Sequence, residues 1–225
     1  MSAADGKATL GAWLDGLDLR LDDAQWELLA LYLSELKKVA DKVNLTADLD
    51  EDSWWRRHIA DGLAAVGPMK KRLGPAPTIL DLGAGAGFVG IALKVAWPEA
   101  TISLLESSYR KFLFLNTASA RVGVKGLRVY WCRAGAPSPV DSFDAVIERA
   151  VAPLPVAVRL AAPLTRAGGL VVAWQSEKPD PDERKLKNAL AATGARAEDP
   201  LPYRLPGENR DRWLAFFRRE ETAQT

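Results

Sequence analysis

The chain of 225 residues has only one cysteine, Cys132, and one histidine, His58. A single cysteine excludes an intramolecular disulfide and a cysteine zinc cluster, and it favours a reducing compartment. No uncharged apolar run approaches the roughly 20 residues of a membrane helix. Acids and glycines interrupt the first residues, where a signal peptide needs an apolar core. We therefore expect a cytoplasmic protein without a membrane anchor.

The chain also lacks an excess of charge of either sign, because its formal net charge is +1. If the protein binds nucleic acid, its basic residues must be concentrated locally. The hydrophobic fraction of 48% and the charged fraction of 26% are ordinary for a globular protein. This length predicts one full-sized domain with a modest extension.

The sequence pattern changes near GPAPT, at residues 74–78. Before it the pattern is helical: Asp22 is expected to cap a helix, and a second helix is expected to begin at Asp52 or Ser53. The first helix has an apolar stripe of Leu28, Tyr32, Leu36, Val39 and Val43. We predict a helical extension over residues 1–75 and a separate domain over residues 76–225.

After Thr78, short apolar runs alternate with amphipathic stretches. The helix that follows the second run is expected to begin at Ser107 and to stop at Gly123. The runs that we expect to be strands are TILDL, ATISLLE, LRVYW, FDAVIE, GGLVVAW and RWLAFFRR. This alternation predicts an α/β fold with a mainly parallel, doubly wound sheet.

The segment ILDLGAGAGFVG fits two ligand-binding signatures at once. Gly85, Gly87 and Gly90 match G-x-G-x-x-G, which is typical of a turn that binds a dinucleotide. Asp81, Gly83, Gly85 and Gly87 match D-x-G-x-G-x-G, which is typical of a turn that binds S-adenosylmethionine. A third possibility is a tight turn without a ligand.

The carboxylate of Asp81 favours S-adenosylmethionine. In a doubly wound sheet the ligand lies beyond the carboxyl ends of the strands, where Asp81 is expected. A carboxylate there repels a pyrophosphate but attracts the ammonium and the sulfonium of S-adenosylmethionine. Glu106, expected at the end of the second strand, fits the ribose of either ligand. We therefore expect a Rossmann-like class I methyltransferase with S-adenosylmethionine as its cofactor.

Five segments resemble one family, the bacterial methyltransferases that modify N7 of a guanine in 16S ribosomal RNA, also called glucose-inhibited division protein B. The segments are KVNLTA, RHIAD, LDLGAGAGFVGIAL, LLESSYRKFLFL and ERAVAPL. The resemblance covers Leu28 to about Trp174. It implies methylation of a guanine in a loop of 16S ribosomal RNA, either as naked RNA or in a small-subunit precursor particle. We expect a monomer that needs no metal.

The resemblance also assigns roles to individual residues. Arg149 follows the fourth expected strand, where cofactor and acceptor meet, and is our candidate catalytic residue; the alternative is a salt bridge with Glu148 or another acid. Phe88 is either a cofactor contact or simple core. The cofactor-binding candidates are Asp81, Gly83, Gly85, Gly87, Phe88, Glu106, Ala134, Gly135 and Arg149.

The acceptor side is assigned to Arg57, His58, Asp61 and Arg133. N7 of guanine carries a lone pair and no proton, so we expect His58 to shape the pocket rather than to act as a base. The alternative for the segment around His58 is an amphipathic helix with a solvated basic face. Tyr109, Arg110 and Lys111 open the helix after the second strand, where they either reach RNA or form only its exposed start.

The chain departs from the family pattern at several positions. Gly62 stands for a serine, Glu106 for an aspartate, and Trp213 for a histidine, while Trp174, Gln175 and Ser176 replace Leu-Lys-Gly. The lost lysine and histidine put the RNA contacts of that region in doubt. Two other functions stay open at this point: a methyltransferase of a small molecule or protein, and a non-catalytic RNA-binding assembly factor. Asp81 disfavours an NAD-dependent oxidoreductase.

Overall fold

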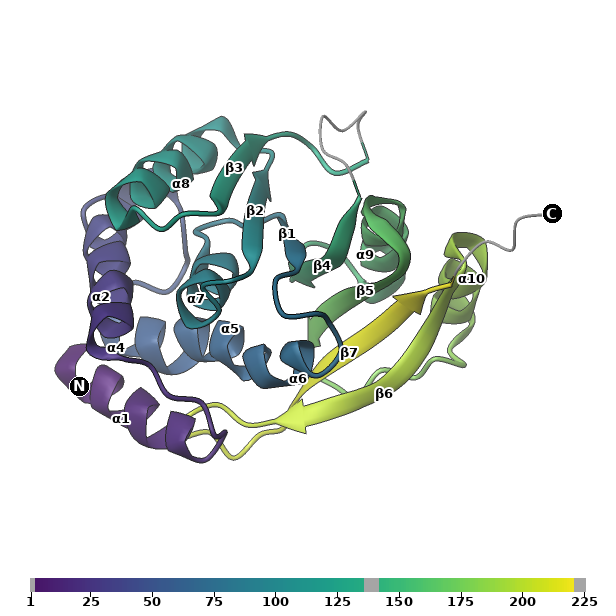
Figure 1. Ribbon diagram of the computed structural model, residues 1–225, viewed down its shortest axis with the longest axis horizontal. Helices are drawn as coiled ribbons and strands as arrows, with labels where there is room; N and C mark the ends of the chain where they lie inside the picture. Colours follow the sequence, from purple (N-terminus) through teal and green to yellow (C-terminus); the bar gives the residue numbers. More distant parts are fainter. Residues whose placement is uncertain (1–2, 136–141, 221–225) are drawn as a thin grey trace.

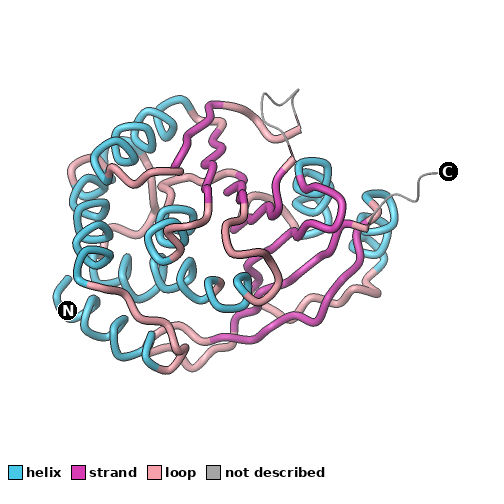
Figure 2. The backbone as a smooth tube through the Cα atoms, viewed as in Figure 1, coloured by secondary structure: helices cyan, strands magenta, loops and turns pink. Residues whose placement is uncertain are grey.

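The computed structural model describes residues 3–135 and 142–220. Its centre is a sheet of seven strands in the order β3-β2-β1-β4-β5-β7-β6. The strands are β1 (Thr78–Leu82), β2 (Thr101–Glu106), β3 (Leu127–Trp131), β4 (Phe143–Arg149), β5 (Thr165–Gln175), β6 (Ala195–Tyr203) and β7 (Arg212–Arg219). The first five are parallel, while β7 is antiparallel to both β5 and β6. The prediction of a mainly parallel sheet is confirmed. Figure 2 shows the strands in magenta among the helices.

Helices cover both faces of this sheet (Figure 1). The N-terminal helices pack with α7 and α8 on one face, and α9 and α10 pack on the other. The N-terminal helices are α1 (Ala3–Asp15), α2 (Asp23–Lys37), α3 (Ala40–Val43), α4 (Glu51–Ser53), the π-helical η1 (Trp54–Ile59), α5 (Ala60–Ala64) and α6 (Val66–Lys70). The later helices are α7 (Phe88–Ala96), α8 (Tyr109–Val122), α9 (Leu154–Ala161), the short 3-10 helix η2 (Ala162–Leu164) and α10 (Arg184–Thr193).

Asp22 caps α2 as predicted, in a reciprocal capping box with Gln25. The predicted apolar stripe is only partly right. Tyr32 and Leu36 are buried, but α2 ends at Lys37, so Val39 and Val43 lie beyond it. The buried residues of α2 are Leu29, Tyr32, Leu33 and Leu36.

The predicted start of the second helix is wrong. Asp50 is the N-cap, and its carboxylate accepts a hydrogen bond from the backbone N–H of Ser53. Both predicted residues lie inside the helix, where the Asp52 carboxylate binds the Arg56 guanidinium and the Ser53 hydroxyl donates to Asp48. The helix continues through η1, a π-helical segment that no hydrophobic period indicates.

Three further differences concern element ends and elements not predicted. The N-cap of α8 is Ser108, not Ser107. The backbone N–H of Ser108 donates to the Glu106 carboxylate at 2.7 Å. Gly123 ends α8 with a φ of 68°, as predicted. The sequence prediction missed α1 and β6. The β6 strand contains two prolines and a register shift between Glu198 and Leu201, both typical of an edge strand.

The N-terminal helices share one hydrophobic core with the sheet. The Tyr32 hydroxyl donates to the carbonyl of Ala86 at 2.8 Å, and the Gln25 amide donates to the carbonyl of Val95 at 2.7 Å. Both acceptors belong to the β1–α7 turn or to α7, so α2 fixes the segment that follows β1. Within the described part of the chain, no helix is long and apolar enough to cross a membrane.

Candidate active site

The glycine loop between β1 and α7 needs glycine at three positions for conformational reasons. Gly83, Gly85 and Gly87 have left-handed φ angles of 69°, 60° and 89°. At Gly83 a Cβ would also lie 2.8 Å from Cγ2 of Val151. These are the glycines of the D-x-G-x-G-x-G signature, and together they bring the backbone of the loop around the end of β1.

Gly90 has a different role. It lies within α7 and has no left-handed φ, but a Cβ there would overlap Leu104 and lie 2.7 Å from Oδ2 of Asp81. The fourth glycine therefore permits the close packing of α7 on β1 and β2. Its presence completes the dinucleotide signature without any requirement for a dinucleotide.

Two carboxylates hold this loop from the ends of neighbouring strands. Asp81 is buried, and its Oδ2 accepts the backbone N–H of Gly90 at 2.9 Å. Burial raises the pKa of Asp81 to about 7, although the Gly90 hydrogen bond and the charge of Arg149 act in the opposite direction. Oε2 of Glu106 accepts the backbone N–H of Gly85 at 2.9 Å.

A cavity of about 140 Å³ lies against the glycine loop. Phe88 forms one wall and is almost fully buried; its ring stacks on the imidazole of His58, with centroids 4.5 Å apart and planes at 17°. Phe88 is thus a core residue and a cavity wall at once. The lining residues are Leu45, Thr46, His58, Asp81, Gly83, Ala84, Gly85, Ala86, Phe88, Val89 and Arg149.

A larger cavity of about 610 Å³ adjoins the first, and the two share Thr46, His58 and Arg149. Its walls come from the N-terminal helices, from the segment after β4 and from the β6–β7 hairpin. They include Arg57, Asp61, Trp174, Gln175, Ser176, Tyr203 and Arg212. Arg149 therefore lies between a small cavity beside the glycine loop and a wider one beside the N-terminal helices.

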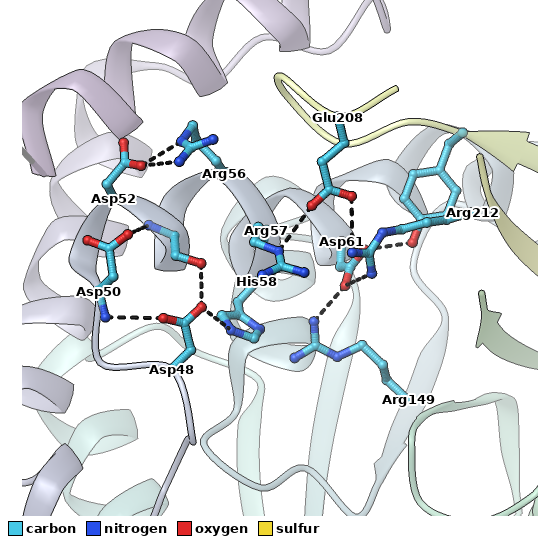
Figure 3. A network of polar contacts seen from close by, with 12 residues as sticks. Asp48, Asp50, Asp52, Arg56, Arg57, His58, Asp61, Arg149, Glu208 and Arg212 are labelled. Atoms are coloured by element: carbon cyan, nitrogen blue, oxygen red, sulfur yellow. Dashed lines mark hydrogen bonds and ion pairs between the residues drawn. The ribbon is translucent and has the colours of Figure 1, made fainter. Parts of the chain in front are cut away.

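Asp61 organises the boundary between the cavities (Figure 3). The Arg149 guanidinium donates to Oδ2 of Asp61 at 2.8 Å, and the Tyr203 hydroxyl donates to Oδ1 at 2.6 Å. The indole N–H of Trp174 donates to the Asp61 backbone carbonyl at 2.9 Å. A salt bridge of Arg149 therefore exists, with Asp61 as its acid.

Glu148, the other acid considered as a partner of Arg149, is buried without an ion pair to any described residue. Its Oε2 is 3.4 Å from the backbone N of Val151, and its Oε1 has no hydrogen-bond partner among the described residues. Burial raises the pKa of Glu148 to about 7.

His58 is neutral at pH 7. Burial, followed by the charge of Arg149, lowers the pKa of its imidazole to about 4, although Asp61 and Asp48 oppose this shift. Its Nε2 lies 3.5 Å from Oδ2 of Asp48. Because the imidazole is neutral at pH 7, this contact is not an ion pair there. Asp48 instead accepts the Ser53 hydroxyl and the backbone N–H of Asp50.

A second group of charges borders the wider cavity. Glu208, in the β6–β7 turn, contacts Nε of Arg57 at 3.1 Å and Nη2 of Arg212 at 3.2 Å. Nη1 of Arg212 is also 3.8 Å from Oδ2 of Asp61. Sequence reasoning missed Asp48, Tyr203 and Arg212. Tyr203 lies on the strand that was not predicted, and Arg212 was treated only as part of a strand.

The structure does not bring every candidate to the cavities. Gly87 and Glu106 are not among the lining residues of either one, and neither are Arg133, Ala134 and Gly135, which follow β3. Arg133 is exposed, and Gly135 has a left-handed φ of 83°. They lie after the strand next to β2, on the side of the glycine loop where Glu106 lies.

The chain is similar to known proteins over most of its length. A sequence model of the family described as rRNA small subunit methyltransferase G matches residues 25–200. The protein of that name from Acetivibrio thermocellus is 32% identical over 196 residues, which cover 85% of this chain and 79% of that protein. The one from Moorella thermoacetica is 27% identical over 220 residues, covering 96% and 91%.

Solved structures share the fold at lower identity. A geranyl diphosphate methyltransferase in complex with S-adenosylmethionine aligns with a TM-score of 0.56 and 14% identity, over 72% of this chain and 85% of that one. Aeropyrum pernix fibrillarin with bound S-adenosylmethionine aligns with a TM-score of 0.51 and 18% identity, over 63% and 66%. The predicted class I methyltransferase fold is confirmed.

Proposed function

The chain belongs to the rRNA small subunit methyltransferase G family, and from this membership we propose that it methylates N7 of a guanine in 16S ribosomal RNA. S-adenosylmethionine is the cofactor, and it supplies a methyl group bound to a positively charged sulfur. The observation that carries the proposal is the pair of adjoining cavities, which share Thr46, His58 and Arg149. The smaller one lies against the glycine loop, and the larger one leaves room for a base.

The residues of the smaller cavity fit S-adenosylmethionine. Asp81 offers a buried carboxyl to a cationic ligand, and Gly83 and Gly85 line the cavity with backbone atoms only. Glu106 offers a carboxylate to the ribose hydroxyls. We propose that Asp81, Gly83, Gly85, Gly87, Phe88, Glu106, Ala134, Gly135 and Arg149 contact the cofactor.

Arg149 is the candidate catalytic residue. Its contact with Asp61 uses one N–H group of a guanidinium that has five, and its side chain lines both cavities. The remaining N–H groups can donate to O6 of a guanine and hold N7 in line with the methyl group. The Asp61 carboxylate that accepts from Arg149 is itself held by the Tyr203 hydroxyl.

The proposed transfer needs no general base. The N7 lone pair forms the new bond to the methyl carbon, the old bonding pair stays on the departing sulfur, and no proton moves. A neutral His58 agrees with this chemistry. We propose that His58, Arg57, Asp61 and Arg133 lie on the acceptor side.

Further parts of the proposal concern the whole protein. Residues 1–75 form the helical extension and residues 76–225 the methyltransferase domain. The protein acts as a cytoplasmic monomer without a metal ion, on naked 16S ribosomal RNA or on a small-subunit precursor particle.

Incubation with methyl-labelled S-adenosylmethionine tests the function. The acceptors are deproteinised 16S RNA, precursor particles and intact small subunits from cells that lack the enzyme, with and without a chelator. We expect label at one guanine N7, mapped by cleavage at the methylated base, and no effect of the chelator. Absence of label from every RNA acceptor, or label at another base, would contradict the proposal.

A further inference from the structure

The positive charge of this protein is concentrated in one segment. Residues 107–135 contain six basic residues and no aspartate or glutamate, although the whole chain has a net charge of only +1. The bases are Arg110, Lys111, Arg121, Lys125, Arg128 and Arg133. A local excess of this kind in a nearly neutral protein is the pattern expected where an anionic polymer binds.

This basic segment forms one edge of the molecule. It consists of α8 and β3, which pack together, and β3 is the terminal strand among the described residues, where it pairs with β2 (Figure 1). The N-terminus of α8 and the carboxyl end of β3 meet at the sheet edge where the glycine loop lies. Arg110, Lys111 and Arg133 therefore lie near the proposed cofactor site, whereas Arg121, Lys125 and Arg128 lie at the opposite end of α8 and β3.

Three aromatic rings come together where α8 begins and β3 ends. The centroids of Tyr109 and Trp131 are 4.8 Å apart, and the ring planes of Phe112 and Trp131 are inclined by only 27° at 6.3 Å. Trp131 is 59% exposed and Tyr109 is 51% exposed. We call Tyr109, Phe112 and Trp131 the aromatic platform.

The platform is fixed rather than loosely attached. The indole N–H of Trp131 donates to the backbone carbonyl of Ser107 at 3.1 Å, and Trp131 is the β-sheet partner of Glu106. A large ring that is half exposed yet held by a hydrogen bond presents a preformed apolar surface to solvent. Stacking of an unpaired base needs such a surface.

The cations beside the platform are available for a partner. Within the described residues, no carboxylate lies within ion-pair distance of Arg110, Lys111 or Arg133. Arg57, Arg149 and Arg212, at the wider cavity, all have carboxylate partners. An alternative role for basic residues on an edge strand is to prevent edge-to-edge association of two sheets. That role alone does not explain why three aromatic rings cluster beside them.

We propose that the aromatic platform stacks on an unpaired base of the RNA substrate, while Arg110, Lys111 and Arg133 contact the neighbouring phosphates. The inference rests on the proposed function and adds a second RNA contact, on the opposite side of the glycine loop from the wider cavity. It anchors RNA beside the cofactor end of the site. Recognition there depends on stacking and charge, so it tolerates any base sequence.

Binding of a fluorescein-labelled oligoadenylate to the full-length protein, measured by anisotropy, tests the stacking. We expect Trp131→Leu, which keeps apolar bulk but removes the aromatic ring, to weaken binding about tenfold, the size of one lost base stack. Trp131→Phe should restore most of the affinity. Affinity for S-adenosylmethionine without RNA should stay unchanged in both variants, which also shows that they fold.

The chain offers a matched control for the charges. Arg110 and Lys111 lie in the first turn of α8, and the exposed Arg184 and Lys185 lie in the first turn of α10. For the double variant Arg110→Gln/Lys111→Gln we expect the slope of log affinity against log salt to become shallower by about 1.4, since each phosphate contact to a single strand contributes about 0.7. Arg184→Gln/Lys185→Gln should leave the slope unchanged.

Several results would overturn the inference. They are oligoadenylate affinity unchanged by Trp131→Leu, an equal loss of salt dependence in both double variants, or a loss of S-adenosylmethionine affinity in Trp131→Leu, which would assign the ring to the cofactor. The proposed function is tested separately, by methylation of small-subunit RNA with the wild-type protein. If oligoadenylate binds through the platform but no ribosomal RNA is methylated, only the proposed function fails.

Discussion

Arg149 lies where the two cavities meet, and its ion pair with Asp61 leaves open whether it serves the structure or the reaction. Arg149→Lys separates these roles, because lysine keeps the charge but loses the planar fork. We expect turnover to fall at least tenfold, which corresponds to only about 1.4 kcal/mol of transition-state positioning. Cofactor affinity should change less than about threefold. Single-turnover methylation and calorimetry measure the two quantities.

The control for this variant is Arg166→Lys. Arg166 also pairs with an aspartate, Asp144, but at the opposite end of β4 and β5. Its replacement should leave turnover unchanged. A wild-type rate in Arg149→Lys would make Arg149 a salt-bridge residue only.

Asp81 gives cofactor binding a pH dependence. Because the pKa of the ligand-free carboxyl is raised to about 7, Asp81 is mostly protonated below that pH, and a cationic ligand must displace the proton. Affinity for S-adenosylmethionine should therefore rise between about pH 6 and pH 7.5, before the ligand's own amino group loses its proton near 8. Asp81→Asn should weaken binding at least tenfold at pH 7.5 and remove this dependence. A pH-dependent affinity that persists in Asp81→Asn would contradict the assignment.

Glu148 is expected to destabilise the ligand-free protein at high pH. Burial raises its folded-state pKa from 4.5 to about 7, so the folded protein retains a proton that the unfolded chain releases between these values. The advantage of Glu148→Gln should therefore appear as pH rises through 4.5 and level off above about 7. One pKa unit is worth about 1.4 kcal/mol, which gives a plateau of about 3 kcal/mol in the free energy of unfolding. Urea titrations at several pH values measure it, and a pH-independent difference would contradict the inferred ionisation.

At the scale of elements, the crossing of α5 over α7 explains one departure from the family pattern. A Cβ at Gly62 would lie 2.8 Å from Cβ of Ala92 and 3.0 Å from the carbonyl oxygen of Val89, so serine does not fit there. We expect Gly62→Ala to cost about 1–3 kcal/mol through overpacking. Ala92→Gly should recover part of the loss. Thermal and urea unfolding of the single and double variants measure it.

Gly67 is the matched control for Gly62. It also lies in a helix, α6, but apart from its chain neighbours nothing approaches its Cβ position within 4 Å. Gly67→Ala should change stability by less than about 1 kcal/mol, because the smaller loss of conformational freedom of alanine is opposed by contact of its Cβ with the ring of Pro68. Equal effects at both positions would show that helix propensity, not the contact with α7, determines the cost.

The sequence best predicted the elements that are formed by interactions between neighbouring residues. The N-cap at Asp22, the left-handed stop at Gly123 and the glycine turn depend on neighbouring residues, and the prediction found them. The β6 strand depends on a distant partner, because it forms by pairing with β7. The start of α4 was missed although its cause is local: the Asp50 carboxylate accepts the backbone N–H of Ser53, three residues later.

The same distinction applies to the candidate site. Asp81, the glycines and Arg149 stand at the ends of predicted strands, so topology alone placed them near one another. Tyr203 and Arg212 reach Asp61 only through the antiparallel hairpin at the far edge of the sheet. No local pattern around either residue signals that contact.

At the scale of the whole molecule, the site is assembled from three separate parts of the chain. The N-terminal helices contribute His58 and Asp61, the parallel strands contribute Asp81 and Arg149, and the β6–β7 hairpin contributes Tyr203. The Tyr203 hydroxyl and the Asp61 carboxylate are joined across 142 positions of sequence. A site of this kind keeps its geometry only if the three parts remain folded together.

We therefore expect the helical extension and the sheet to unfold as one cooperative unit, although the sequence divides them near residue 75. Two features connect α2 to the sheet: the shared hydrophobic core, and the hydrogen bonds from Tyr32 and Gln25 to the segment after β1. Opening of α2 alone would break both, so we expect α2 to open together with the sheet. Native-state hydrogen exchange in low urea should give the amides of α2 and β1 the same free energy of opening. Tyr32→Phe, which removes the hydrogen bond to Ala86, should lower both values together by about 1 kcal/mol. Exchange of α2 at a distinctly lower free energy than β1 would show that the extension opens independently of the sheet.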